Sequence, residues 1–132
     1  MTTQELAQYT ALKDAIAALE ERKEALIISA TSATHELNDA PRGGAGTVSD
    51  IVGTKGAKIA DIERMIARKK WEMDMKLEQI VEYIGGVTDA LVFAAMTLHY
   101  IDGATWNEAA HKLNNTADSV RMAVNRYVNA NP

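Results

Sequence analysis

The chain has 132 residues, a formal net charge of −4 at pH 7 and 47% hydrophobic residues. This is the size of one domain with enough apolar side chains for a core, which excludes global disorder. The absence of cysteine excludes disulfide bonds, thiolate metal sites and cysteine nucleophiles, and it fits a reducing cytoplasm. The longest apolar run, residues 90–96, is too short to span a bilayer, and Glu5 precedes any apolar stretch. We therefore expect a cytoplasmic protein with no secretory signal and no membrane contact.

The charge is distributed unevenly along the chain. Residues 1–40 carry 3 basic and 7 acidic side chains, residues 41–80 carry 8 and 6, and residues 81–132 carry 3 and 5. The negative total argues against a protein coated in positive charge for nucleic acid. Any basic surface must be local, and the middle third alone has a positive net charge.

Apolar residues recur at steps of three, four and seven near the start of the chain, which predicts a helix from about Gln4 to about Ala30. They are Leu6, Tyr9, Leu12, Ile16, Leu19 and Leu26. Residues 31–49 lose this spacing and contain the Pro/Gly sequence 41–46, so we expect a flexible loop at about 31–49. A phosphate-binding loop has a lysine and then a serine or threonine directly after its last glycine, whereas Gly46 is followed by Thr47 and Val48, which excludes such a loop. Arg42 remains a candidate for a loose contact with a nucleic-acid backbone.

A second apolar stripe with the same spacing predicts a helix that ends near residue 84. It consists of Val52, Ile59, Ile62, Ile66, Met73, Leu77, Ile80 and Ile84. Ser49-Asp50 offers an N-cap and Gly85-Gly86 a stop, while Gly53 and Gly56 weaken the first turns, so firm helix is expected only from about Lys58. Two long amphipathic helices joined by a loop predict an antiparallel, coiled-coil-like hairpin over residues 1–84, which can pair with a second copy as a dimer.

Two clusters on this second helix leave alternatives open. The first cluster consists of Met65, Met73 and Met75 beside Trp71. The methionines either belong to the core or form a pliable binding groove, and their helical spacing favours the core. The second cluster consists of Arg64, Arg68, Lys69 and Lys70. It is either a solvated face paired to the acidic first helix or a set of phosphate contacts.

Residues 85–132 have the capping and turn signals of three successive helices. Thr88-Asp89 can cap a helix that ends at Asp102-Gly103, and the capping box 105–108 starts a short second helix. Asn114-Asn115 makes a tight turn and Thr116 caps the final helix. The inward positions of the last two helices are expected to be Ala109, Ala110, Leu113, Val120, Val124, Tyr127 and Val128. This order predicts a C-terminal helix-turn-helix, whose last helix lies in a DNA major groove.

The sequence 100–108, followed by Ala110, Leu113, Thr116, Val120 and Arg121, resembles region 4 of bacterial sigma factors. It is more similar still to the small phage-encoded transcriptional regulators of Gram-positive bacteria, which share a long charged first helix, a Pro-Arg-Gly-Gly loop (here 41–44) and a second long helix. The resemblance implies a sequence-specific regulator of phage genes that binds double-stranded DNA in the host cell cytoplasm. Its DNA-binding candidates are Thr116, Ala117, Asp118, Ser119, Arg121, Met122, Asn125 and Arg126.

The chemistry of these candidates agrees in part with DNA reading. Arg121 can pair with guanine, Asn125 with adenine, and Ser119 with a base or a phosphate. The chain departs from the family pattern where Ala109 replaces a branched aliphatic residue, where Asp118 would repel phosphates, and in the absence of a run of arginines. We therefore expect weak affinity from this motif alone, with a second copy or the basic middle helix supplying the rest.

No enzyme, metal site or cofactor is expected. The sequence from Glu108 to His111 is half of a di-iron motif, but that chemistry needs a second such pair and two further glutamates on facing helices. No serine or threonine has a recognisable base and orienting partner. The alternative function is a helical protein-interaction factor that binds RNA polymerase or another phage protein and little DNA. The net charge of −2 over residues 81–132 favours that alternative.

Overall fold

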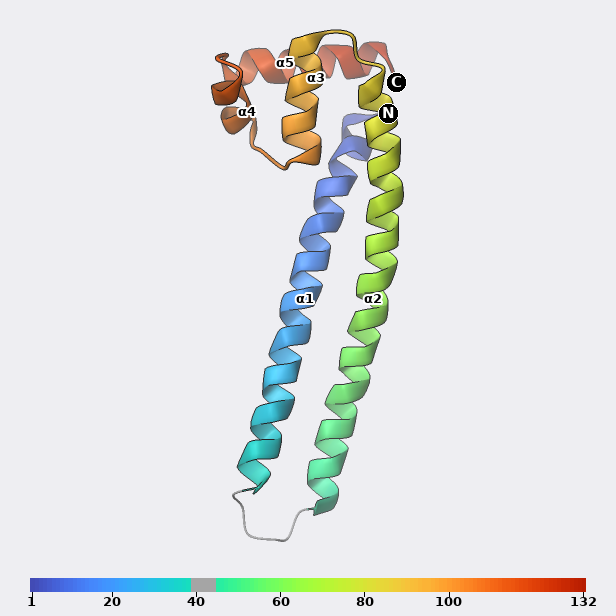
Figure 1. Cartoon of the computed structure of the whole chain (residues 1–132), viewed down its shortest axis with the longest axis vertical. Helices are drawn as coiled ribbons and strands as arrows, with labels where there is room; N and C mark the ends of the chain where they lie inside the picture. Colours follow the sequence, from blue (N-terminus) through green and yellow to red (C-terminus); the bar gives the residue numbers. More distant parts are fainter. Residues whose placement is uncertain (39–44) are drawn as a thin grey trace. The chain divides into compact units, whose positions relative to one another are not determined.

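The computed structural model of the chain describes residues 1–38 and 45–132, and side chains for residues 1–31 and 53–132. All regular secondary structure in these residues is helical, which confirms the all-α class (Figure 1). None of the described helices is both long and apolar enough to cross a membrane. The elements are α1 (Thr3–Asn38), α2 (Ala45–Gly85), α3 (Ala90–Met96), the π-helical segment η1 (Thr97–Ile101), α4 (Trp106–Lys112) and α5 (Ala117–Ala130).

Both long helices include residues that the sequence pattern assigns to the loop between them. α1 continues past Ala30 to Asn38, and α2 begins at Ala45 rather than at Ser49, so the predicted loop boundaries at 31 and 49 are wrong. The Thr31 hydroxyl donates to the Ile27 carbonyl 2.9 Å away, which lets a polar residue remain inside the helix. Gly53 and Gly56 also lie within α2, so the expected helix start near Lys58 is wrong. A helix-interior glycine costs only about 1 kcal/mol. Residues 41–44, with Arg42, lie outside the described residues.

The described residues form two compact units, which do not coincide with the division at residues 84–85 expected from sequence. Unit 1 is Met1–Lys13 with Glu72–Pro132, and unit 2 is Asp14–Trp71. The difference arises because the first turns of α1 and the last turns of α2 contribute side chains to the same core as α3 and α5. The ends of the long helices therefore belong to unit 1.

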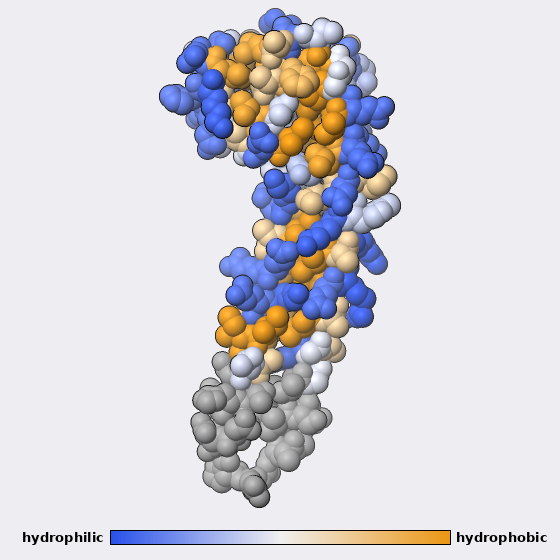
Figure 2. All heavy atoms as spheres, in the orientation of Figure 1, coloured by the Kyte–Doolittle hydropathy of each residue, from blue (hydrophilic) through white to orange (hydrophobic). Residues whose placement is uncertain are grey.

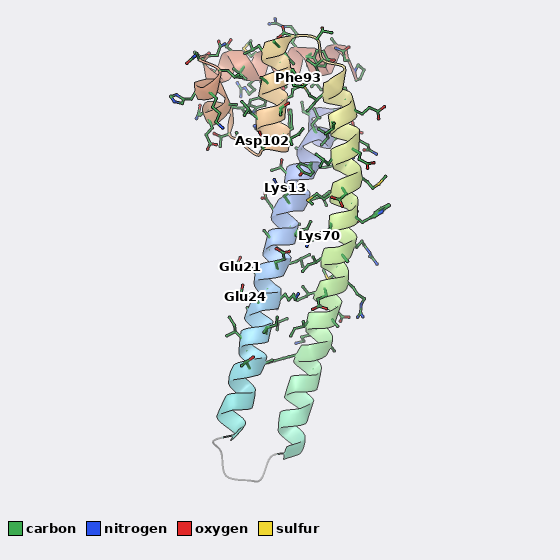
Figure 3. All side chains as sticks on the ribbon, viewed as in Figure 1. Lys13, Glu21, Glu24, Lys70, Phe93 and Asp102 are labelled. Atoms are coloured by element: carbon green, nitrogen blue, oxygen red, sulfur yellow. The ribbon has the colours of Figure 1, made fainter. Side chains whose placement is uncertain are left out.

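In unit 2 the two helices run antiparallel and are linked by ion pairs. The Lys23 Nζ lies 3.4 Å from the Glu63 Oε1, and the Nζ of Lys70, a residue labelled in Figure 3, lies 3.4 Å from the Glu20 Oε1. Higher residue numbers on α1 thus meet lower numbers on α2. Each pair has half-exposed side chains and is worth only about 0–1 kcal/mol, so the ion pairs align the helices more than they stabilise them.

The apolar stripe of unit 2 is only partly buried. Ile16 and Ile66 are buried, and hydrophobic atoms follow the line between the two helices (Figure 2). The other seam residues are half-buried: Leu19, Leu26, Ile59 and Ile62. Met65 is 50% exposed, so the prediction that it belongs to the core is wrong, and Trp71 on the same helix is 65% exposed. The reason is helical geometry, because Trp71 lies about 140° around the helix from Ile66. Met75, on the unit 1 part of α2, is also exposed.

Unit 1 has a continuous apolar core. Its buried members are Leu6, Tyr9, Ile80, Ile84, Val87, Val92, Ala95, Met96, Tyr100, Ala110, Val120, Val124 and Val128. α5 packs against both α3 and α4, and α4 also contacts η1 (Figure 1). The core therefore fixes α5 through its three valines while the opposite side of that helix stays outside.

Side-chain caps set the starts of helices in unit 1. The Asp89 carboxylate accepts the Val92 N–H at 3.1 Å and the Thr105 hydroxyl accepts the Glu108 N–H at 3.1 Å, which confirms Asp89 and Thr105 as N-caps. α1 starts with a full capping box that was not predicted, although its Thr-x-x-Glu signal is present in the sequence. The Thr2 N–H donates to Glu5 Oε2 at 2.7 Å, and the Glu5 N–H donates to Thr2 Oγ1 at 3.2 Å. The backbone bond from Thr2 holds the pKa of Glu5 below its usual value.

Candidate nucleic-acid interface

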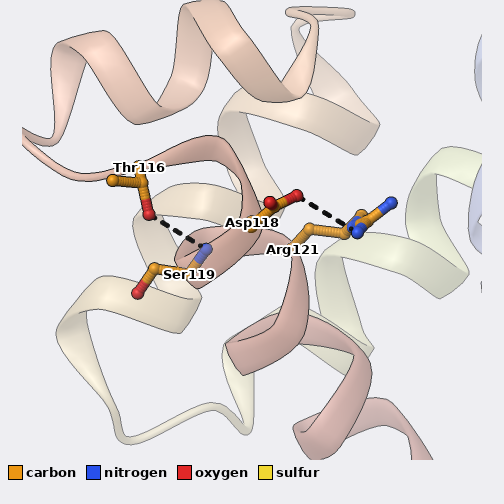
Figure 4. A network of polar contacts seen from close by, with 4 residues as sticks. All are labelled: Thr116, Asp118, Ser119 and Arg121. Carbon is orange, nitrogen blue, oxygen red and sulfur yellow. Dashed lines mark hydrogen bonds and ion pairs between the residues drawn. The ribbon is translucent and has the colours of Figure 1, made fainter.

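The turn between α4 and α5 determines how α5 is presented. Asn114, in the predicted tight turn, has φ +53°, a left-handed conformation that asparagine tolerates better than most residues. The Asn115 N–H donates to the Ala110 carbonyl at 2.9 Å and closes the turn. Thr116 is extended, and its hydroxyl accepts the Ser119 N–H at 3.2 Å, which confirms it as the N-cap of α5 (Figure 4). Local hydrogen bonds thus set both the end of α4 and the start of α5.

α5 has one buried side and one outward side. Val120, Val124 and Val128 are buried at intervals of four residues. Six of the eight DNA-binding candidates are exposed: Thr116, Asp118, Ser119, Arg121, Met122 and Arg126. Ala117 and Asn125 are half-buried, and Ala117 packs against the core. The candidates therefore lie along the helix outside its valine stripe, with Ala117 and Asn125 partly covered.

The charge of this outward side is low. The Arg121 Nη2 lies 3.2 Å from the Asp118 Oδ1, with both side chains more than half exposed (Figure 4). α5 also carries Arg126, so its two arginines and one aspartate give a formal charge of +1. Asp118 lies in the first turn, where a carboxylate also interacts favourably with the helix dipole. This arrangement offers little general attraction for phosphates.

Met122 is the apolar member of the outward side. Its side chain is 56% exposed although it lies between the core positions Val120 and Val124 in sequence. An exposed methionine contributes little to folding, but its thioether and methyl group can contact the methyl group of thymine. Met122 therefore complements the hydrogen-bonding chemistry of Arg121 and Asn125.

The candidate phosphate contacts on α2 lie in unit 2, and Arg64 and Lys70 are engaged in ion pairs. Arg64 pairs with Asp61 on the same helix, and Lys70 pairs with Glu20 of α1. Lys69 is half-buried and Arg68 is exposed. The Lys70–Glu20 pair matches the interpretation of this cluster as a face paired to the acidic first helix.

An aromatic cluster that the sequence analysis missed joins η1 to α4. The His99 and Trp106 rings stack with centroids 3.7 Å apart and planes 16° apart, and Tyr100 meets both rings edge-on. The His99 Nδ1 lies 2.7 Å from the Ala104 carbonyl oxygen, so this nitrogen carries the proton and donates it. Gly103, at φ +77°, makes the turn between these rings. The cluster positions α4, and through α4 the start of α5.

Burial lowers the pKa of His99 below the ordinary histidine value of about 6.5, although its bond to Ala104 acts in the opposite direction. The unfolded chain then takes up a proton at a higher pH than the folded chain. Folding stability should therefore decrease as the pH falls from about 6.5 toward the pKa of folded His99, and be unaffected by this group at higher pH. Urea unfolding of wild type and His99→Phe at several pH values measures this. We expect wild type to lose more stability on acidification than the variant; parallel curves would contradict the prediction.

The C-terminal end of α5 is held by α2 of the same unit. The Tyr83 hydroxyl donates to the Asn131 carbonyl at 2.6 Å, and the Tyr83 and Tyr127 rings meet edge-on with centroids 6.1 Å apart. Burial raises the pKa of Tyr83, and the neighbouring Tyr127 adds to the effect. Both ends of α5 are therefore anchored, by Thr116 at its start and by Tyr83 at its end.

The described residues contain no group of three or more histidine, aspartate or glutamate side chains that could hold a metal ion. Glu108, from the di-iron half-motif, lies at the capped start of α4. Comparisons with protein-family models, with curated proteins and with solved structures find no match for this chain. A functional assignment therefore depends on the geometry of α4 and α5.

Proposed function

We propose that this chain is a phage-type DNA-binding transcriptional regulator. In this proposal α4 and α5 form a helix-turn-helix, and α5 enters the major groove of double-stranded DNA. The observation that carries the proposal is the division of α5 into a buried valine stripe and an outward side with Arg121, Met122 and Asn125. These three side chains fit guanine, the thymine methyl group and adenine respectively. The resemblance of residues 100–121 to phage regulators supports the same function.

The proposal includes a homodimer that pairs through unit 2. Its seam is half-buried, and Met65 and Trp71 are exposed, so a second copy would cover apolar surface that one copy leaves in water. A dimer would also present two copies of α5 to two half-sites, which compensates for the low charge of each. Sedimentation of the full chain measures this part of the proposal. A monomer at the concentrations used for DNA binding would contradict it.

Titration of fluorescent duplexes containing 16 randomised base pairs, at 50 and 200 mM salt, tests DNA binding directly. With about four phosphate contacts per complex, we expect affinity to fall about 100-fold between the two concentrations. Selection of tight binders from the same pool should then enrich a defined sequence, because the outward side of α5 contacts base edges. No binding at 50 mM salt would reject the proposed function.

A second candidate function is a protein-interaction factor that contacts RNA polymerase and binds little DNA. Unit 1 carries exposed apolar side chains outside α5: Met75 at 41%, Val81 at 52% and Phe93, labelled in Figure 3, at 44% exposure. The net charge of −2 over residues 81–132 also favours a protein partner over DNA. Under this alternative the chain should comigrate with purified RNA polymerase without DNA. The substitution Phe93→Ser should weaken that association, whereas Arg121→Ala should leave it unchanged.

A further inference from the structure

The Asp118–Arg121 pair is the only ion pair that the structure gives within the described part of α5. It joins the one acidic side chain of the helix to a residue with base-reading chemistry, and neither partner is needed for the core. The Asp118 side chain is 83% exposed and the Arg121 side chain 52% exposed, so both groups are available to a macromolecule that covers this surface (Figure 4).

The geometry of the pair leaves most of the guanidinium free to donate. Arginine has five N–H donors in a rigid fork, and Asp118 accepts from one terminal nitrogen at 3.2 Å. The remaining donors can still form two parallel hydrogen bonds to the O6 and N7 atoms of guanine. The carboxylate restricts the arginine side chain, which would otherwise be free to swing toward phosphates.

We propose that Asp118 is a specificity-determining residue, which holds Arg121 for a guanine base edge and keeps it from the phosphate backbone. This inference rests on the proposed DNA-binding function and assigns one G·C base pair of the site to this ion pair. The carboxylate is negatively charged, so it repels phosphates, and it accepts hydrogen bonds, so it tolerates a neighbouring cytosine amino group. Asp118 therefore lowers affinity for random DNA and raises the relative affinity for the guanine-containing site.

The experiment selects binders from duplexes with 16 randomised base pairs, using the full-length wild type, Asp118→Asn and Asp102→Asn. Asp102 is exposed and lies in the turn after η1, so its variant removes the same charge without touching Arg121 (Figure 3). Circular dichroism confirms that each protein remains folded. We expect wild type and Asp102→Asn to enrich the same sequence. In Asp118→Asn the preference for one G·C pair over other base pairs should be about tenfold weaker than in wild type, with the preferences at other positions unchanged.

The salt dependence of binding to the unselected pool provides a second readout. In Asp118→Asn the released Arg121 should contact one more phosphate, so affinity for random duplexes should rise and the slope of log affinity against log salt should steepen by about 0.9. Unchanged base preference in Asp118→Asn, or the same loss in Asp102→Asn, would overturn the inference while leaving DNA binding intact. If wild type enriches no sequence, both the inference and the proposed function fail.

Discussion

Replacement of Leu6 by alanine is expected to lower the free energy of unfolding of unit 1 by about 2–5 kcal/mol. Leu6 is fully buried in a cluster that includes Ile80, Ile84 and the valines of α5. The substitution removes apolar contacts and leaves a cavity, since the helices around it are anchored at several other points. Urea unfolding followed by Trp106 fluorescence measures the effect, with Trp71 replaced by phenylalanine so that the signal comes from unit 1 alone.

The control for this prediction lies on the same helix. Ile28 is 59% exposed in unit 2, and Ile28→Ala should change stability by no more than about 0.5 kcal/mol. If Leu6→Ala and Ile28→Ala have equal small effects, the first turns of α1 do not contribute to the core of unit 1. A large effect of Leu6→Ala would show that the stability of the core that holds α5 depends on the first turns of α1.

Replacement of Arg121 or Asn125 by alanine is expected to remove base preference at one position of the DNA site each, about 1–3 kcal/mol per lost pair of hydrogen bonds. Binding to unselected duplexes should change much less, because base contacts carry sequence information and phosphate contacts carry most of the general affinity. Affinities for the selected duplex and for single-base variants of it, measured at one salt concentration, give the position and size of each loss.

A charge-matched control separates base reading from general electrostatics. Arg22 is exposed on α1 in unit 2, and Arg22→Ala removes the same charge as Arg121→Ala. We expect Arg22→Ala to retain the full pattern of base preference. Equal weakening of every duplex by Arg121→Ala would indicate a phosphate contact and would reject its role as a reader of guanine.

Local chemistry in unit 1 was predictable from sequence because the interacting groups lie within a few residues of each other. Asp89, Thr105 and Thr116 cap helices through N–H groups three positions later, and Gly103 and Asn114, at the predicted helix end and turn, adopt left-handed conformations. The burial of one side of α5 follows from the four-residue spacing of its valines. These features account for the outward placement of most candidate DNA-binding residues.

The extent of the long helices was less predictable, because a helix tolerates polar residues and glycine when the rest of its length is stable. The predicted loop began at residue 31, yet Thr31 satisfies its hydroxyl within α1. Exposure of Met65 was also unexpected, since its helical spacing favoured core. Whether such a side chain is buried depends on the direction in which a neighbouring helix lies.

The sequence by itself determined the all-α class, the caps and turn that start and end α4 and α5, and which side of α5 carries polar chemistry. Only the tertiary structure decided that the beginning of α1 and the end of α2 share a core with α5, and that His99 stacks on Trp106. The Asp118–Arg121 pair, by contrast, is local, because the two residues lie three positions apart on one helix. Caps depend on neighbours along the chain, whereas core membership and ring stacking depend on how helices pack and which rotamers that packing leaves open.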